Sequence, residues 1–163
     1  MLYLGFLMSA LGVGIAVFEY TERLRAVARE YAATLKLLVY LRGAVTNEKR
    51  TPSESVLRFL SAGGEEIRWA SGLCTEESVI AFLRSGETAC VATLLSAEDR
   101  RALSDFFLEL GRTDLSEERV RLDRIINMIE KSSAEKTAES EGKIRSAWVL
   151  FATLVLGVLI LII

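Results

Sequence analysis

Two uncharged apolar runs, LYLGFLMSALGVGIAVF at 2–18 and AWVLFATLVLGVLILII at 147–163, enclose nearly all of the charged residues of the chain. Each run has about 17 residues, so as a helix it is about 25 Å long. A hydrocarbon core is about 30 Å thick, and a helix of this length is at the short end of what spans it. The two runs therefore predict an N-terminal and a C-terminal transmembrane helix on either side of a polar domain.

The second run is the more hydrophobic of the two, because it is rich in Leu, Ile, Val and Phe. Each of these residues favours membrane insertion by about 0.3–0.6 kcal/mol. Trp148 opens the run directly after Lys143 and Arg145, where an interfacial anchor is expected. A buried core helix is the alternative interpretation of this run.

The first run carries small residues at steps of four, three and four, which places them on one helix face. Small faces allow transmembrane helices to approach closely, so this face is predicted to pack on a neighbouring helix, with the C-terminal helix of the same chain as one candidate. A cleaved signal peptide is the alternative, although no basic segment precedes the run. The predicted packing stripe consists of Gly5, Ser9, Gly12 and Ala16.

Basic residues flank both runs on the side of the central domain. Basic residues close to membrane spans stay in the cytoplasm, so we expect a cytoplasmic central domain with both chain ends on the opposite side. The flanking residues are Arg23, Arg25 and Arg29 after the first run, and Lys131, Lys136, Lys143 and Arg145 before the second.

The segment between the runs predicts an all-α fold, with a small multi-helix domain at 19–130 and a polar stalk helix at 131–146. Apolar residues recur at steps of three and four from 19 to 45, which is typical of a long packed helix. The stalk has charges of both signs and no apolar face, which is typical of a solvated helix. Two short patterns, TPSE at 51–54 and SAED at 96–99, are typical of helix starts.

The composition excludes several classes of function. Without histidine there is no Ser-His or Cys-His dyad. Cys74 and Cys90 are too far apart, and lack companions, for an ordinary zinc site, and are interpreted as buried thiols, with a disulfide as the alternative. The chain has neither a Walker A motif nor GxGxxG, and its net charge of −2 lacks the basic excess typical of proteins that bind nucleic acid. We therefore predict no catalytic, cofactor-binding or metal-binding residues, no nucleic-acid partner and no small-molecule substrate.

The layout of two terminal spans around a helical domain, together with TPSESVL at 51–57 and FLELGRTD at 107–114, resembles the stage III sporulation protein AB family. The resemblance covers essentially the whole chain. The helical domain of that family in turn resembles the platform proteins of type II secretion and type IV pilus machines.

The resemblance implies a non-enzymatic structural subunit of a secretion-like channel complex. It implies a location in the mother-cell membrane around the forespore, with the cytoplasmic domain placed to meet the secretion-type ATPase and other stage III sporulation proteins of the complex. A membrane-bound regulatory or sensor module of another pathway is a second hypothesis, and a membrane enzyme is a third.

Two loops are predicted to form a partner-binding surface: the turn at Thr51 and Pro52, and the loop after the helix that ends near residue 110. The alternative is that Gly111 only ends a helix and that Thr51 and Asp114 only begin helices. The candidate partner-binding residues are Thr51, Pro52, Gly111, Arg112, Thr113 and Asp114.

Overall fold

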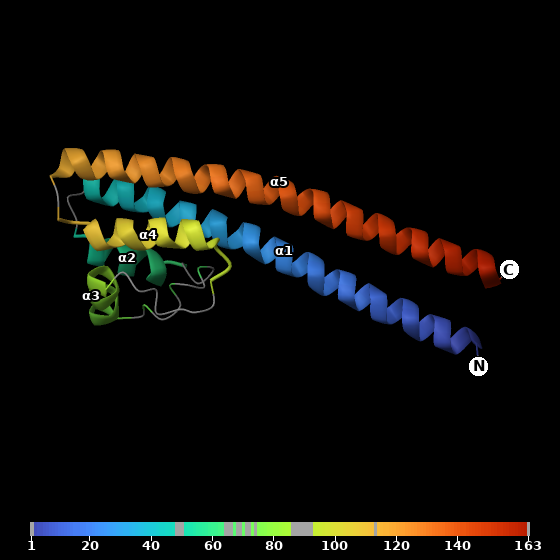
Figure 1. The fold of residues 1–163 in the computed structure, drawn as a ribbon. Coiled ribbons are helices and arrows are strands. Elements are labelled where there is room, and N and C mark those ends of the chain that lie inside the picture. Colours follow the sequence, from blue (N-terminus) through green and yellow to red (C-terminus); the bar gives the residue numbers. More distant parts are fainter. Residues whose placement is uncertain are drawn as a thin grey trace. The chain divides into compact units, whose positions relative to one another are not determined.

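In the computed structural model, five helices and no strand occur in the residues described, which confirms the predicted all-α fold. The helices are α1 (Leu2–Asn47), α2 (Pro52–Ser61), α3 (Glu76–Ser85), α4 (Ala97–Glu109) and α5 (Leu115–Ile162) (Figure 1). The structure describes residues 2–47, 51–63, 67, 70, 73, 75–85, 93–112 and 114–162, with side chains left undescribed at 2–7, 9–10, 46–47, 85, 158–159 and 161–162.

Two of the predicted helix starts are confirmed by their caps. Thr51 lies just before α2, and its hydroxyl accepts a hydrogen bond from the Glu54 N–H at 3.4 Å. Ser96 has the same role before α4, where it accepts from the Asp99 N–H at 3.1 Å. Both caps satisfy a backbone donor that has no partner inside the helix.

The chain divides into two compact units. The first unit, called the helix pair, consists of residues 1–28 and 135–163, and the second, called the helical unit, consists of residues 29–134. Long helices α1 and α5 contribute to both units. The sequence predicts divisions after residues 18, 130 and 146, whereas the contacts place them after Ala28 and before Glu135. Most of the polar stalk therefore belongs to the same unit as the apolar ends.

The core of the helical unit is built around α1. Tyr31, Leu37, Leu38 and Leu41 are completely buried along it. Phe107 on α4 is 1% exposed. Its ring centroid lies 5.1 Å from that of Phe82 and 5.3 Å from that of Phe106. Helix α5 closes the core with Leu122, Ile125, Ile126 and Ile129.

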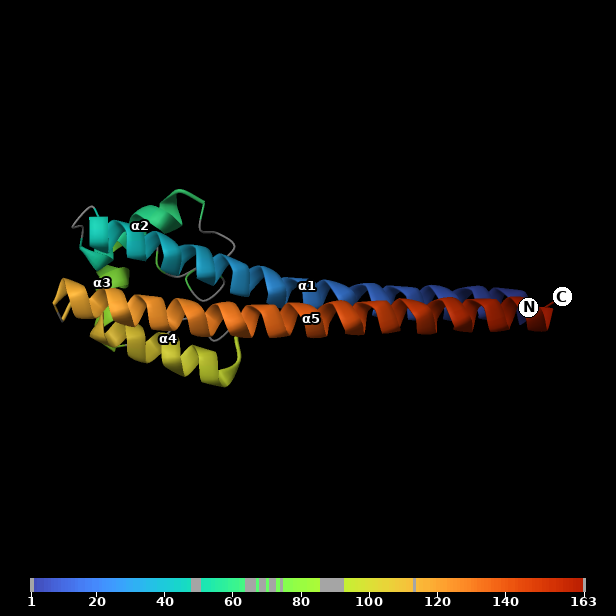
Figure 2. The same ribbon diagram turned by 90° about the horizontal axis from the view of Figure 1, so that it is seen from above.

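The helix pair consists of the first part of α1 and the last part of α5, which run side by side with both chain ends at the same end of the pair (Figures 1 and 2). At Gly14, an added Cβ would lie 3.4 Å from the ring of Phe151, so the two helices are in close contact there. Among the residues of this unit whose side chains are described, only Thr21 and Ser140 are buried. Many large apolar side chains of the pair are exposed, whereas Phe151 is half-buried against Gly14.

Within the part of the chain that the structure describes, no helix combines the length and the apolar character needed to cross a membrane. The transmembrane helices predicted at 2–18 and 147–163 are therefore not supported by the structure. Some side chains of these runs, at 2–7, 9–10, 158–159 and 161–162, lie outside the description. Cys74, Cys90 and Thr113 also lie outside the described residues.

Candidate functional site

The two loops predicted to bind a partner lie against each other in the helical unit. An added Cβ at Gly111 would lie 3.2 Å from Cγ of Pro52, so the loop after α4 packs directly on the first turn of α2. Gly111 has φ of +83°, a backbone conformation that favours glycine because it is costly for other residues. Thr51, Gly111, Arg112 and Asp114 are all exposed at this place.

A buried carboxylate holds the loop between α4 and α5. The Gly111 N–H donates to Oε1 of Glu118 at 2.6 Å, and the Glu118 N–H donates to the Asp114 carbonyl at 2.9 Å. Glu118 is 5% exposed. Its sequence position indicated only an acidic residue in a first helical turn, and nothing in the local pattern pointed to a contact with Gly111.

The surface formed by Thr51, Pro52, Gly111, Arg112 and Asp114 is called the loop surface below. Its residues have identifiable structural roles, since Thr51 caps α2 and Gly111 turns the chain after α4. Arg112 is exposed and, within the described residues, its guanidinium has no hydrogen-bond partner. The loop surface therefore offers polar and charged groups for binding in addition to its part in folding.

Within the described side chains, the two members Gly12 and Ala16 of the predicted stripe of small residues do not contact α5. Gly12 and Ala16 are exposed, and no atom lies within 4 Å of a Cβ added at Gly12. The face of α1 that turns toward α5 carries Gly14, which is two residues away and so about 160° around the helix. The side chains of Gly5 and Ser9 lie outside the description.

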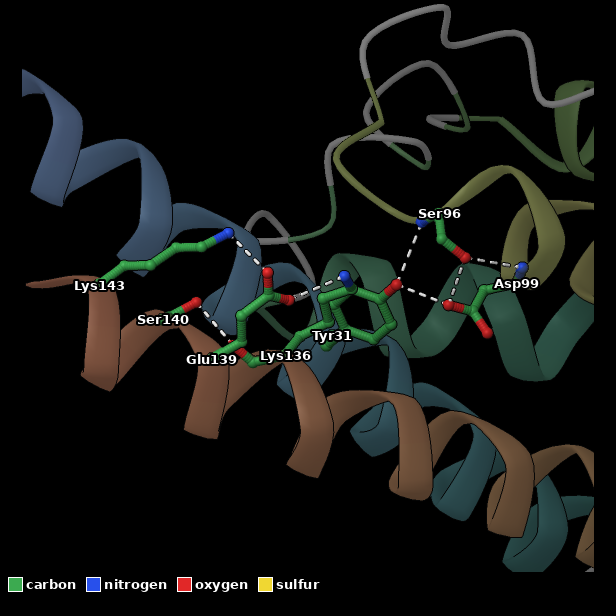
Figure 3. A network of polar contacts seen from close by, with 7 residues as sticks. All are labelled: Tyr31, Ser96, Asp99, Lys136, Glu139, Ser140 and Lys143. Carbon is green, nitrogen blue, oxygen red and sulfur yellow. Dashed lines mark hydrogen bonds and ion pairs between the residues drawn. The ribbon is translucent and has the colours of Figure 1, made fainter.

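A cluster of charges lies on α5 in the helix pair, at the polar end of the second run. Glu139 Oε1 accepts from Lys143 Nζ at 2.5 Å, and Glu139 Oε2 accepts from Lys136 Nζ at 3.1 Å (Figure 3). The hydrogen bonds from Lys143 and then Lys136 lower the pKa of Glu139, and the hydrogen bond to Glu139 raises the pKa of Lys143. Tyr20 on α1 lies near enough to Lys143 to add to this rise in pKa.

These contacts give the register of the helix pair. Gly14 faces Phe151, and Tyr20 lies near Lys143. The residues on α1 are about 9 Å apart along the axis and those on α5 about 12 Å, as expected for two antiparallel helices. Glu19 and Arg145, the charged residues next to the two uncharged runs, therefore lie at nearly the same level of the pair.

A buried polar network joins three helices of the helical unit. The Tyr31 hydroxyl donates to Oδ2 of Asp99 at 2.6 Å and accepts from the Ser96 N–H at 3.1 Å (Figure 3). Ser96 Oγ also donates to Oδ2 of Asp99 at 2.7 Å, and Ser132 Oγ of α5 donates to Oδ1 at 2.9 Å. Burial and the hydrogen bond to Asp99 raise the pKa of Tyr31.

The residue before Tyr31 makes a second buried contact of the same kind. Glu30 is 1% exposed, and its Oε1 accepts from the Thr93 hydroxyl at 3.0 Å while its Oε2 accepts from the Leu94 N–H at 3.0 Å. Two consecutive residues of α1 thus fasten the segment 93–96 that leads into α4. Because the carboxylates of Glu30 and Asp99 are occupied by these structural bonds, we interpret the network as a joint between elements.

Sequence reasoning missed this network, because Glu30 and Tyr31 lie more than sixty positions from their partners at 93–99 and each fits an ordinary helical pattern. Within the described residues, no group of three or more His, Cys, Asp or Glu side chains could hold a metal ion. Comparisons of the chain with models of protein families, with curated proteins and with solved structures find no match.

Proposed function

We propose that this protein is a non-enzymatic, membrane-anchored subunit of the stage III sporulation complex, held in the mother-cell membrane around the forespore by its terminal helices. In this proposal the helical unit lies in the cytoplasm and docks partner subunits, including the secretion-type ATPase, through the loop surface. The sporulation context rests on the resemblance of TPSESVL at 51–57 and FLELGRTD at 107–114 to that family.

The membrane part of the proposal is supported above all by the surface of the helix pair. Ten of its large apolar side chains have exposures between 37% and 73%, while the two buried side chains of the described part belong to Thr21 and Ser140. Small residues between helices and large apolar residues outside are typical of helices that associate in a bilayer. The outward apolar residues are Met8, Leu11, Val13, Ile15, Phe18, Val149, Leu150, Leu154, Leu156 and Ile160.

The docking part is supported by the loop surface. Two segments about sixty residues apart in the sequence meet at Pro52 and Gly111, and the contact leaves Arg112 and Asp114 exposed beside it. Such a surface has two loops on a rigid helical scaffold, which is where binding residues commonly lie. The buried polar groups Tyr31 and Asp99 serve the packing of this scaffold.

An alkaline carbonate wash of membranes from an endospore former that expresses the full chain tests the anchor. We expect the protein to stay with the membrane. Leu154→Arg should reduce the retained fraction, because Leu to Arg near the centre of a span costs about 3–4 kcal/mol of insertion. Glu141→Arg, which introduces the same side chain outside the run, is the control. Release of the unchanged protein by carbonate would refute the anchor.

Copurification from detergent extracts tests the docking role. The stage III ATPase should be recovered with the full chain, and Arg112→Glu should lower its recovery without lowering the melting temperature. Arg101→Glu, at an exposed position of α4 away from the loop surface, is the matched control. If the protein stays in the membrane but recovers no component of the complex, the regulatory module of another pathway becomes the better description.

A further inference from the structure

Each helix of the pair carries an exposed aromatic residue with a polar tip close to the end of its uncharged run. Tyr20 on α1 is 45% exposed, and Trp148 on α5 is 44% exposed. From the contact of Gly14 with Phe151, and with Tyr20 six residues after Gly14 and Trp148 three residues before Phe151, the two aromatic residues lie about 5 Å apart along the pair. Two helices therefore present amphipathic rings at a common level.

The basic side chains near this level differ in whether an acidic residue of the chain already pairs with them. Lys136 and Lys143 are both held by Glu139, and Arg25 is held by Glu22 at 2.9 Å. Arg145 is exposed, and no ion pair or hydrogen bond of its guanidinium occurs within the described part of the chain. Arg145 precedes Trp148 by three residues, so both side chains lie on the same face of α5.

We propose that Tyr20, Arg145 and Trp148 form a collar that binds the phospholipid headgroup layer, with the Arg145 guanidinium on lipid phosphate and the two rings at the boundary with the acyl chains. The proposal rests on the membrane anchor proposed above and adds the depth at which the helix pair sits. The collar separates the outward apolar residues, from Phe18 on α1 and Val149 on α5, from the charged cluster around Glu139.

The dimensions of a bilayer fit this assignment. The headgroup layer is about 5–8 Å thick on each side of the hydrocarbon core, which accommodates the axial spread of the two aromatic residues. Tyr and Trp are enriched at this depth because one part of the ring is apolar and the other forms hydrogen bonds. Arg contributes planar donors that suit phosphate oxygens.

A lipid fits the collar better than a protein partner. The exposed apolar side chains below the collar occur on both helices of the pair and are not confined to one face of one helix. A protein partner would cover one side, whereas acyl chains cover all sides at once. The charged residues end at one level of both helices, which fits the flat boundary that a membrane provides.

Trp148 fluorescence in vesicles measures the depth directly. The chain has two tryptophans, so Trp69→Phe leaves Trp148 as the only one. The full chain is reconstituted in vesicles of phosphatidylcholine and phosphatidylglycerol that contain lipids brominated near the headgroup end or near the middle of the acyl chain. We expect stronger quenching by the shallow bromines. If Trp69→Phe misfolds, the quenching of Trp148 is obtained as the difference between the parent protein and Trp148→Phe, which retains Trp69.

Arg145→Leu tests the role of the guanidinium. Removal of the charge should let Trp148 sink, so the ratio of deep to shallow quenching rises, while Arg124→Leu at an exposed position of the same helix leaves the ratio unchanged. Equal or deeper quenching in the parent protein, or an unchanged ratio in Arg145→Leu, overturns the collar. If the parent protein is still retained in the membrane after a carbonate wash, the membrane anchor holds even when the collar is overturned. The two proposals therefore fail separately.

Discussion

The two units of this protein use their residues in opposite ways. In the helical unit, large apolar side chains such as Leu41 and Phe107 are buried, and the carboxylates of Glu30 and Asp99 are buried with them under hydrogen bonds. In the helix pair, Leu150 is 69% exposed and Ile160 is 73% exposed, while the hydroxyl residues Thr21 and Ser140 are buried. One unit buries large apolar side chains, and the other leaves several of them exposed.

The difference also appears in how buried hydroxyls are satisfied. In the helix pair, Thr21 and Ser140 donate to carbonyls of their own helices, at 2.9 Å and 2.6 Å. In the helical unit, the Tyr31 hydroxyl bonds to a residue 68 positions away. Hydroxyls satisfied within one helix add little cohesion between helices, so the two units should respond differently to mutation.

The largest expected effect is the contrast between two Leu to Ala substitutions. Leu41 is completely buried, so Leu41→Ala should cost about 2–5 kcal/mol of the free energy of unfolding. Leu150→Ala removes the same atoms from an exposed position and should change it by less than about 0.5 kcal/mol. Urea unfolding of the full chain in detergent measures both. Equal losses would contradict the opposite organisation of the two units.

A smaller effect is expected from the two tyrosines. Tyr31→Phe leaves the half-buried Ser96 N–H without its partner and the buried Asp99 Oδ2 with one donor fewer, and should cost about 1–3 kcal/mol. Tyr20→Phe, on the exposed side of the helix pair, is the control and should cost little. A fully retained stability in Tyr31→Phe would show that the network is not a structural joint.

The same variant has a pH signature. Because folding raises the pKa of Tyr31 above its ordinary value of 10.0, the stabilising effect is complete below pH 10 and is lost as the pH rises through the raised value. The melting temperature of the parent should therefore fall more steeply with pH above pH 10 than that of Tyr31→Phe. Parallel alkaline profiles would contradict this assignment.

Two glycines of α1 distinguish the packed face of the helix pair from its outer face. Gly14→Leu places a side chain against the Phe151 ring and should cost about 1–3 kcal/mol through overpacking. Gly12→Leu meets no atom within 4 Å and should be neutral or stabilising, because Leu is the better helix former. Melting temperatures in detergent compare them. A lower melting temperature for Gly12→Leu than for Gly14→Leu would show that the face with Gly12 is the one that packs between α1 and α5.

The smallest effect is expected at Glu139. Its lowered pKa and the raised pKa of Lys143 mean that the pair contributes above the ordinary carboxyl value of 4.5 and below the ordinary ammonium value of 10.5. Glu139→Gln should lower the melting temperature slightly inside this window at low salt, and less at high salt, because the groups are exposed. A loss that is insensitive to salt would indicate another cause.

Much of the fold was predictable because local patterns set it. The caps at Thr51 and Ser96 and the positive φ at Gly111 depend on a few neighbouring residues, and the structure has each of them where the pattern indicated. The choice of Gly12 and Ala16 as the packing face was wrong for the contact with α5. Several helix faces carry small residues, and sequence spacing alone does not say which of them meets the partner helix.

The loop surface and the network show the same limit. Residue types at Pro52 and Gly111 indicated two separate turns, and only the fold brought them within van der Waals contact. Asp99 was recognised as part of a helix start, but its contacts with Tyr31 and Ser132 cross from α4 to α1 and α5. Long-range contacts of this kind leave no periodic trace in the sequence.

The sequence by itself determined the helices, their caps and the separation of uncharged ends from a charged middle, because propensity, capping and hydropathy act between residues that are near in the chain. The tertiary structure alone decided that Gly14 faces Phe151, that Glu19 and Arg145 lie at one level, and that Asp99 joins three helices. These depend on the register and rotation of helices α1, α4 and α5, which are settled by the packing of side chains distant in sequence.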